Sequence, residues 1–336
     1  MHIFKNTTYD FLRWRWQAIG LSWVVIIAGA AMLATTGLPL GVEFAGGTSI
    51  VAQFDQTPSI QQVRGALDRN YPGGGQNTVV QVYGDAAQRQ VMIRVPQVGT
   101  ESGASLSTAA QQVEAALRQG NVGNFKIVGT EIVGPAVGSE LRTRGLSATV
   151  LSLAGLLLYI AFRFQFSFAV GAVVATIHDL LITLAFLAFF RYDMSLNVVA
   201  AILTITGFST NDTIVIFDRI RENLRGMRRD NLGHVINVSV NQTLGRTVIT
   251  SGTALLTAVA LFFFGGEVLH AFAFTMIVGI VTGTYSSVFI AAAIVSFWRG
   301  KAPTRAATHA PATSASPAAV QQPTRKSKPQ RKARAS

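Results

Sequence analysis

The stretch TGFSTNDTIVIFDRIREN, Thr206–Asn223, places an amide and a carboxyl, Asn211 and Asp212, inside a long apolar run. That run, LNVVAAILTITGFSTNDTIVIF, is long enough to cross a bilayer, which takes roughly 17–25 residues. A charged side chain within a membrane span costs several kcal/mol and by default marks an ion or substrate pathway. The fold and the function both depend on how the rest of the chain accommodates this carboxyl.

The composition is typical of a membrane protein. The chain has 336 residues, of which 49% are hydrophobic and only 13% charged, and its mean hydropathy is +0.38. It contains no cysteine, which excludes a disulfide framework and thiolate metal ligands. The five histidines are scattered without metal-ligand spacing, so we expect no metal and no bound cofactor.

Six apolar segments are long enough to be spans: 17–36, 146–162, 167–190, 196–217, 247–264 and 269–298. The second is short unless its helix begins near Leu141. The first could be a secretory signal peptide. Its apolar region exceeds the usual ~7–15 residues and no small-x-small cleavage site follows, so we favour an uncleaved anchor.

The basic residues predict the orientation, because cytoplasmic segments carry an excess of Lys and Arg. The first 16 residues, the loop after the fourth span and the tail from Arg299 are all basic, and with six spans they share one side. The net charge of +12 therefore reflects topology rather than a specific nucleic-acid partner. The basic tail could contact anionic lipid headgroups, the ribosome or RNA, or simply fix the orientation.

The insert after the first span has its own pattern. Partly alternating strand segments and helix-periodic segments follow one another as β-α-β-β-α-β, the order of the ferredoxin-like fold. The strands are expected at 47–54, 78–84, 89–95 and 124–134, and the helices at 59–70 and 106–120. Glycines 73–75 precede a strand and are interpreted as a turn. No catalytic grouping occurs in this insert, so we expect no enzyme activity.

The predicted fold is a multi-pass α-helical membrane protein with six transmembrane helices and one extracytoplasmic α+β domain between the first two. Its parts are a cytoplasmic N-terminus (1–16), the first span (17–36), the extracytoplasmic domain (37–140), a five-helix membrane domain (141–298) and a disordered basic cytoplasmic tail (299–336).

A polar face is predicted on the fourth span. Thr206, Ser209 and Thr213 fall along one stripe with Asp212 beside them, and Gly207 and Asn211 lie on the neighbouring stripe. Such a face packs on other helices rather than on lipid. Asp212 could be a proton site, or a structural carboxylate near a helix end.

Arg246, at the inner mouth of the fifth span, is the predicted partner of Asp212. Beside the guanidinium the carboxyl would stay ionised, and away from it, in an apolar site, it would take a proton. These two environments are what a proton relay needs. The alternative is a static buried ion pair.

Two further titratable residues, His178 and Asp179, lie inside the third span and belong either to the relay or to a hydrogen-bonded brace between helices. Other small and polar residues favour close helix packing. These are Thr250, Ser251, Thr253, Thr257, Gly279 and Gly283.

Together these segments resemble the SecF family of protein-export membrane proteins, within the wider RND transporter group. The resemblance covers about residues 10–298 and is carried by GVEFAGGT (41–48), VGPAVGSEL (133–141), IHDLLITL, FSTNDTIVIFDRIREN and NQTLGRTVITSGTALLT. The chain departs from the family at Glu43, Phe208 and Gly245, where the family often has Asp, Tyr and Ser.

The resemblance implies that Asp212 and Arg246 are the proton relay, supported by Asn211, Thr213, Ser209, His178 and Asp179. It also implies a subunit of the Sec translocase that uses the proton gradient, without another cofactor, to promote export of preproteins. The implied partners are SecD, the SecYEG channel, YajC, the translocating preprotein and membrane lipids. The implied location is the cell (inner) membrane.

Two other functions compete with this interpretation. A proton-coupled RND-type exporter of small molecules or lipids would use the same relay. A non-conducting structural assembly subunit would use Asp212 and Arg246 only as a brace.

Overall fold

The computed structural model describes residues 7–56, 58–72, 78–84, 86–95 and 103–299. The expected turn at 73–75, the basic tail beyond residue 299 and Lys5 near the N-terminus therefore lie outside the described residues. Within the described chain, six helical segments are long and apolar enough to cross a membrane, at Phe11–Thr36, Ala136–Arg163, Phe166–Phe189, Leu196–Gly226, Leu232–Phe264 and Val268–Phe297.

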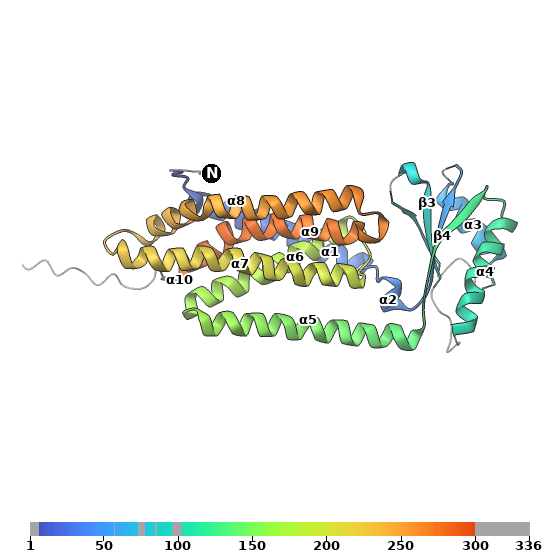
Figure 1. The fold of residues 1–336 in the computed structure, drawn as a ribbon, viewed down its shortest axis with the longest axis horizontal. Coiled ribbons are helices and arrows are strands. Elements are labelled where there is room, and N and C mark those ends of the chain that lie inside the picture. Colours follow the sequence, from blue (N-terminus) through green and yellow to red (C-terminus); the bar gives the residue numbers. More distant parts are fainter. Residues whose placement is uncertain (1–6, 57, 73–77, 85, 96–102, 300–336) are drawn as a thin grey trace, which may run out of the picture. The chain divides into compact units, whose positions relative to one another are not determined.

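All six predicted spans are helical. They correspond to α1 (Arg15–Thr36, preceded by the short helix η1, Phe11–Trp14), α5 (Pro135–Arg163), α6 (Phe166–Phe189), α7 (Leu196–Gly226), α8 (Leu232–Phe264) and α9 (Glu267–Ser286). A π-helical turn, η3 (Ser287–Ala291), continues α9 into α10 (Ala292–Arg299). These helices run side by side in Figure 1.

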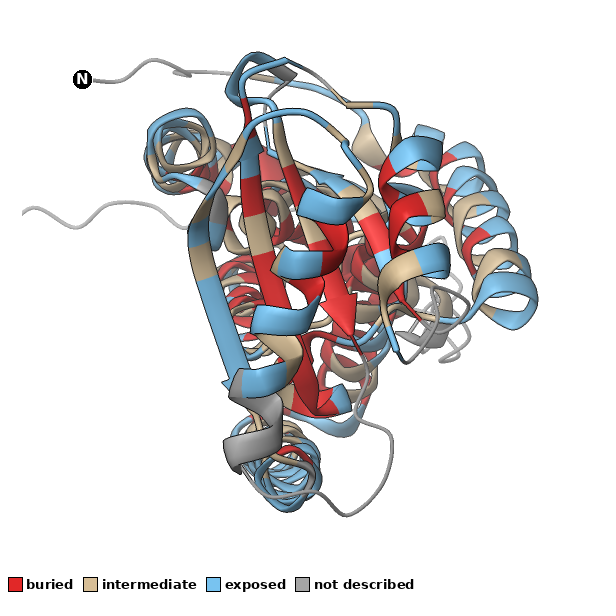
Figure 2. Ribbon diagram, turned by 90° about the vertical axis from the view of Figure 1, so that its right-hand side faces the viewer, coloured by how far each residue is buried: buried red, intermediate tan, exposed pale blue. Residues whose placement is uncertain are grey.

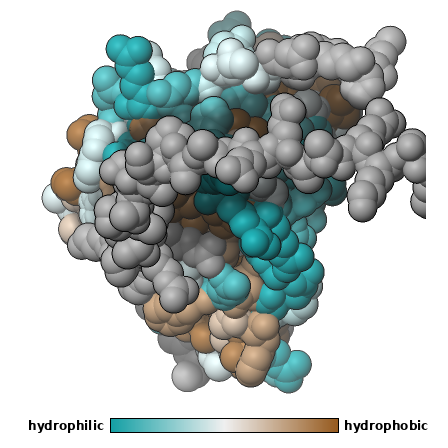
Figure 3. Space-filling model, turned by 90° about the vertical axis from the view of Figure 1, so that its left-hand side faces the viewer, coloured by the Kyte–Doolittle hydropathy of each residue, from teal (hydrophilic) through white to brown (hydrophobic). Residues whose placement is uncertain are grey.

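Several helices are longer than the hydropathy of the sequence predicted. α5 begins at Pro135, which resolves the apparent shortness of the second span. α7 continues to Gly226 and α8 already begins at Leu232, where Asn231 caps it by accepting from Gly233 N at 3.0 Å. The basic residues that follow the fourth span therefore lie on the last turns of α7 and in the turn that joins α7 to α8. This end of the bundle shows hydrophilic side chains in Figure 3.

The insert folds into the predicted α+β unit. After the short helix α2 (Val42–Ala45) come β1 (Gly47–Phe54), α3 (Ile60–Asn70), β2 (Val79–Tyr83), the short helix η2 (Ala86–Gln88), β3 (Gln90–Val95), α4 (Gly103–Gln119) and β4 (Phe125–Val133). The strand order is β2-β3-β1-β4, and all neighbours are antiparallel. This arrangement confirms the β-α-β-β-α-β prediction.

One face of the sheet forms the core of this α+β domain. Ile50 and Phe54 of β1, Ile93 of β3, Leu67 of α3 and Leu117 of α4 are buried there. The two helices cover this face, as Figures 1 and 2 show. Side chains along a strand alternate between the two faces of the sheet. The second face carries Gln81, Arg94 and Glu131, and α3 and α4 do not cover it.

The membrane helices are not equally buried. α6, α7 and α9 form the centre of the bundle, whereas α1, α5 and α8 expose much more of their apolar surface. Small residues let the central helices approach closely. A Cβ added at Gly283 would lie 2.7 Å from the Cβ of Ser209, and one added at Gly279 would meet Ile205. The expected packing role of these two glycines is confirmed.

Candidate functional site

Asp212 is buried on α7, with an exposed fraction of 7%. Thr247 Oγ1 of α8 donates a hydrogen bond of 2.7 Å to Asp212 Oδ1. Asp212 Oδ2 is buried and has no hydrogen-bond partner among the described residues. Leaving a buried carboxylate oxygen without a donor is costly, so the hydrogen bonds within the bundle satisfy only half of this carboxyl group.

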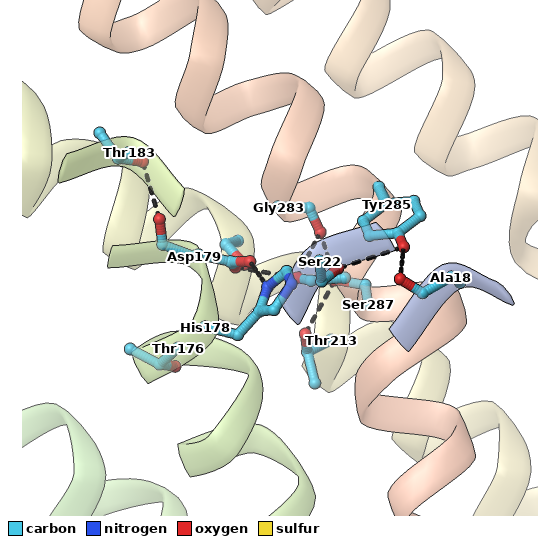
Figure 4. Close-up of polar contacts among 12 residues, drawn as sticks. Ala18, Ser22, Thr176, His178, Asp179, Thr183, Thr213, Gly283, Tyr285 and Ser287 are labelled. Carbon is cyan, nitrogen blue, oxygen red and sulfur yellow. Dashed lines mark hydrogen bonds and ion pairs between the residues drawn. The ribbon is translucent and has the colours of Figure 1, made fainter. Parts of the chain in front are cut away.

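A second carboxyl, Asp179 of α6, lies in a fully hydrogen-bonded position. Its Oδ2 accepts from Ser209 Oγ of α7 at 2.5 Å and from Ser286 Oγ of α9 at 2.8 Å. Its Oδ1 lies 3.0 Å from Nδ1 of His178 (Figure 4). This cluster joins the three central helices through hydrogen bonds to one carboxyl group.

His178 connects this cluster with α1. Its ring lies 6.2 Å from that of Tyr285, whose hydroxyl donates to the Ala18 carbonyl at 2.6 Å and lies 3.2 Å from Ser22 Oγ (Figure 4). Nε2 of His178 is buried without a partner in the described part of the chain. α6 therefore carries a carboxyl group whose two oxygens both have partners, and an imidazole whose Nε2 has none among the described residues.

The two carboxyls belong to one polar region. Ser209, which donates to Asp179, lies three residues before Asp212 on α7, an axial rise of about 4.5 Å at ~1.5 Å per residue. Thr213, next to Asp212, has its Oγ1 2.8 Å from Ser287 Oγ in the π-helical turn η3. A π turn in a helix is frequently found at functional sites, and here it begins beside two serines that face the polar region.

Not every predicted residue joins this region. Arg246 is exposed on α8 and makes no ion pair with Asp212 among the described residues; the next residue, Thr247, faces Asp212 instead. Asn211 is also exposed, on the outer side of α7. Arg246 and Asn211 are thus exposed on the surfaces of α8 and α7, and Asp212 has no ion-pair partner among the described residues.

A polar stripe on the outer surface of α7 and α8 accompanies these two residues. Its members are exposed although they lie in apolar helices: Thr204, Gly207, Asn211, Arg246, Thr250, Thr253 and Thr257. The last three are exposed and so do not pack on another helix of this chain, and their hydroxyls donate to carbonyls of their own helix. Their role in packing against a second polypeptide stays a prediction. Ser251, the remaining hydroxyl residue that was predicted to pack on this helix, is buried and accepts from Thr284 Oγ1 at 2.8 Å.

Sequence reasoning missed Thr247 and Ser286 as partners of the buried acids. A signal existed for Ser286, because it forms a serine pair with Ser287 inside the apolar sixth span. It also missed an ion pair outside the bundle, Arg94–Asp193, whose members are 99 positions apart and carry no local pattern. In the described residues no group of three or more His, Asp or Glu side chains is arranged to hold a metal ion.

The fold and this site define a class, the polytopic membrane proteins that resemble transporters and hold ionisable groups inside the helix bundle. Two family models match the chain. Residues 112–301 match "Protein export membrane protein SecD/SecF, C-terminal", and residues 31–58 match "SecD/SecF GG Motif".

Known relatives agree with these matches. The chain is 42% identical to protein translocase subunit SecF of Pseudomonas aeruginosa, over 88% of this chain and 92% of the relative. It is 37% identical to SecF of Escherichia coli O157:H7, over 85% and 86%. The crystal structure of SecDF, a translocon-associated membrane protein from Thermus thermophilus, superposes with a TM-score of 0.77 at 31% identity.

That superposition covers 88% of this chain but only 39% of the Thermus chain, so this chain spans about two fifths of the length of SecDF. The chain belongs to the SecD/SecF family of protein-export membrane proteins, among the SecF translocase subunits.

Proposed function

We propose that this chain works with SecD in the Sec translocase and uses the proton gradient to promote export of preproteins across the cytoplasmic membrane. The observation that carries the proposal is Asp212, a buried carboxyl with one hydrogen-bonded oxygen and one open oxygen in the centre of the bundle. It can accept a proton on Oδ2 without breaking its bond to Thr247.

The energy scale suits this role. One elementary charge that moves across 100 mV supplies about 2.3 kcal/mol. A few protons per cycle are therefore enough to bias a domain between two arrangements. We assign Asp212 and Arg246 to the relay, with Ser209, Thr213, His178, Asp179 and Asn211 as its polar support.

The polar stripe on α7 and α8 supports a partner on that side. An arginine and several hydroxyls facing lipid would be costly, and a second polypeptide that covers them removes this cost. Transporters of this kind are built from two related halves. SecD is the proposed second half, placed against Arg246 and Asn211. Family membership supports SecYEG and YajC as further partners, with both termini in the cytoplasm and the α+β domain outside.

The test compares inner-membrane vesicles that carry SecD with and without this chain. Preprotein translocation is measured with and without an imposed proton gradient, and SecD is sought by copurification in mild detergent. We expect the gradient-dependent increment to require this chain and SecD to copurify. An unchanged increment in vesicles that lack the chain contradicts the proposal, and copurification without any such increment favours a structural subunit.

A further inference from the structure

The loop between α6 and α7 is a contact point between the outer domain and the membrane helices. Asp193, in this loop, forms an ion pair with Arg94 of β3, with 2.5 Å between Arg94 Nη2 and Asp193 Oδ2. Gln81 of β2 donates to the same carboxylate oxygen at 3.1 Å. The two charged side chains are only 9% and 15% exposed. This pair is therefore largely desolvated, unlike an ordinary surface ion pair.

Backbone hydrogen bonds hold the segment after α1 at the same point. Met194 N donates to the Pro39 carbonyl at 2.8 Å, and Gly41 N donates to the Met194 carbonyl at 2.7 Å. Arg94 Nη1 donates to the Leu40 carbonyl at 2.9 Å. The sheet, the segment that leads from α1 into the domain, and the α6–α7 loop thus meet at Asp193 and Met194.

This loop is also the covalent link between the two helices that carry the buried acids. α6 contains Asp179 and ends at Phe189, and α7 begins at Leu196 and contains Asp212. Ser195 caps α7 by accepting from Val198 N at 3.3 Å. Because an α-helix is stiff over this length, a shift of either helix at the acids also displaces the loop.

The surroundings of the pair leave room for such a displacement. A cavity of about 390 Å³ lies beside it, lined on the sheet side by Gln81, Arg94 and Glu131 and on the helix side by Tyr192, Asp193 and His270. Domain contacts that are small and polar permit relative motion by default. The polar contact at Asp193 is therefore of a kind that lets the sheet move relative to the ends of α6 and α7.

We propose that the Arg94–Asp193 pair is the coupling contact through which proton binding in the membrane bundle displaces the outer domain. This inference rests on the proposed function. It adds the contact through which the free energy of proton binding in the bundle reaches the α+β domain. Removing one partner leaves the other charge desolvated and uncompensated, so the contact fails when either residue is replaced.

The test measures gradient-dependent preprotein translocation in vesicles with SecD present. We expect Arg94→Leu and Asp193→Leu each to lose most of the gradient-dependent increment, and the exchanged pair Arg94→Asp with Asp193→Arg to recover much of it. The matched control is Arg118→Leu, which breaks an ion pair with Glu114 on the exposed side of α4 in the same domain. This control should leave the increment unchanged.

A second arm covers variants that fail to fold. Because the chain has no cysteine, Arg94→Cys with Asp193→Cys can be joined by a short reducible thiol crosslinker. We expect the crosslink to block the gradient-dependent increment and a reductant to restore it. Full activity of the crosslinked protein, or of both single leucine variants, overturns the inference.

An Asp212→Asn arm run in parallel separates this inference from the proposed function. If Asp212→Asn keeps the increment, the proposed function fails and the coupling contact fails with it. If Asp212→Asn loses the increment while the variants at Arg94 and Asp193 keep it, only the coupling contact is wrong.

Discussion

The two buried carboxyls of α6 and α7 differ in the number of hydrogen bonds they accept. Asp179 receives two hydroxyl donors and lies beside His178 Nδ1, whereas Asp212 receives one donor and keeps Oδ2 open. Both oxygens of Asp179 therefore have partners, whereas only one oxygen of Asp212 does. This difference is why we propose Asp212, rather than Asp179, as the proton site.

Thr247→Val tests the single donor to Asp212. Hydrogen bonds to charged groups are worth about 1.5–3 kcal/mol, so removing the hydroxyl should strongly reduce gradient-dependent translocation, and Thr247→Ser should preserve it. The matched control is Thr35→Val, near the end of α1, where the exposed hydroxyl donates to carbonyls of its own helix. Equal activity of Thr247→Val and Thr35→Val would show that the hydrogen bond to Asp212 is unimportant.

Glu131 of β4 provides a pH-dependent test outside the membrane. Partial desolvation of this otherwise exposed side chain, and next the nearby Glu43 carboxylate, raise the pKa of Glu131, while Arg94 partly opposes them. A raised folded-state pKa means that the ionised side chain destabilises the fold. The protonated side chain lacks this penalty. The fold is therefore more stable at acid pH, and it loses this stability as the pH rises through the folded-state pKa of Glu131.

Glu131→Gln should therefore raise the melting temperature of the full chain in detergent at neutral pH. The gain in free energy of unfolding should be below about 1 kcal/mol because the Glu131 side chain is partly solvated. The gain should vanish toward acid pH. A gain that grows as the pH falls would have the wrong sign.

At the scale of elements, small residues on α9 determine how closely it lies on α7. Gly279 and Gly283 are four residues apart and face Ile205 and Ser209, which are also four apart. This spacing keeps Ser286, at the end of α9, within reach of Asp179. Helix packing and the polar cluster therefore depend on the same contact.

Gly279→Ala should disturb this contact, because the added methyl group would meet the Ile205 side chain. We expect a loss of about 1–3 kcal/mol in stability, measured by thermal unfolding in detergent. Gly252→Ala on α8 is the control, since nothing lies within 4 Å of its added Cβ. Equal melting temperatures for the two variants would contradict tight packing at Gly279.

At the scale of the whole molecule, the account requires the α+β domain and the α7–α8 connection to lie on opposite sides of the membrane. The cysteine-free chain makes this directly measurable. Ser59→Cys, in the α+β domain, should react with a membrane-impermeant maleimide added to cells whose outer envelope is permeabilised and whose cytoplasmic membrane is intact. Arg228→Cys should react only in inverted vesicles, and the reverse pattern would overturn the orientation.

The sequence predicted those parts of the molecule that are encoded locally. Long apolar runs and alternating strands identify every span and strand, because hydropathy and periodicity reflect the immediate surroundings. The strand bounds agree within a few residues, whereas α5, α7 and α8 extend well beyond the apolar runs. The contact between Arg94 and Asp193 could not be predicted, because the two residues are 99 positions apart and no local pattern connects them. The orientation of Arg246 could not be deduced either, because the span pattern does not say which helix face another polypeptide covers.

The central claim is that Asp212 binds the proton that drives export. The most direct test is preprotein translocation in vesicles across graded proton gradients, comparing wild type, Asp212→Asn and Asp212→Glu with equal amounts of SecD bound. The account predicts that Asn, which cannot exchange a proton, abolishes the response to the gradient while Glu retains part of it. Full gradient dependence in the Asn variant would contradict the account.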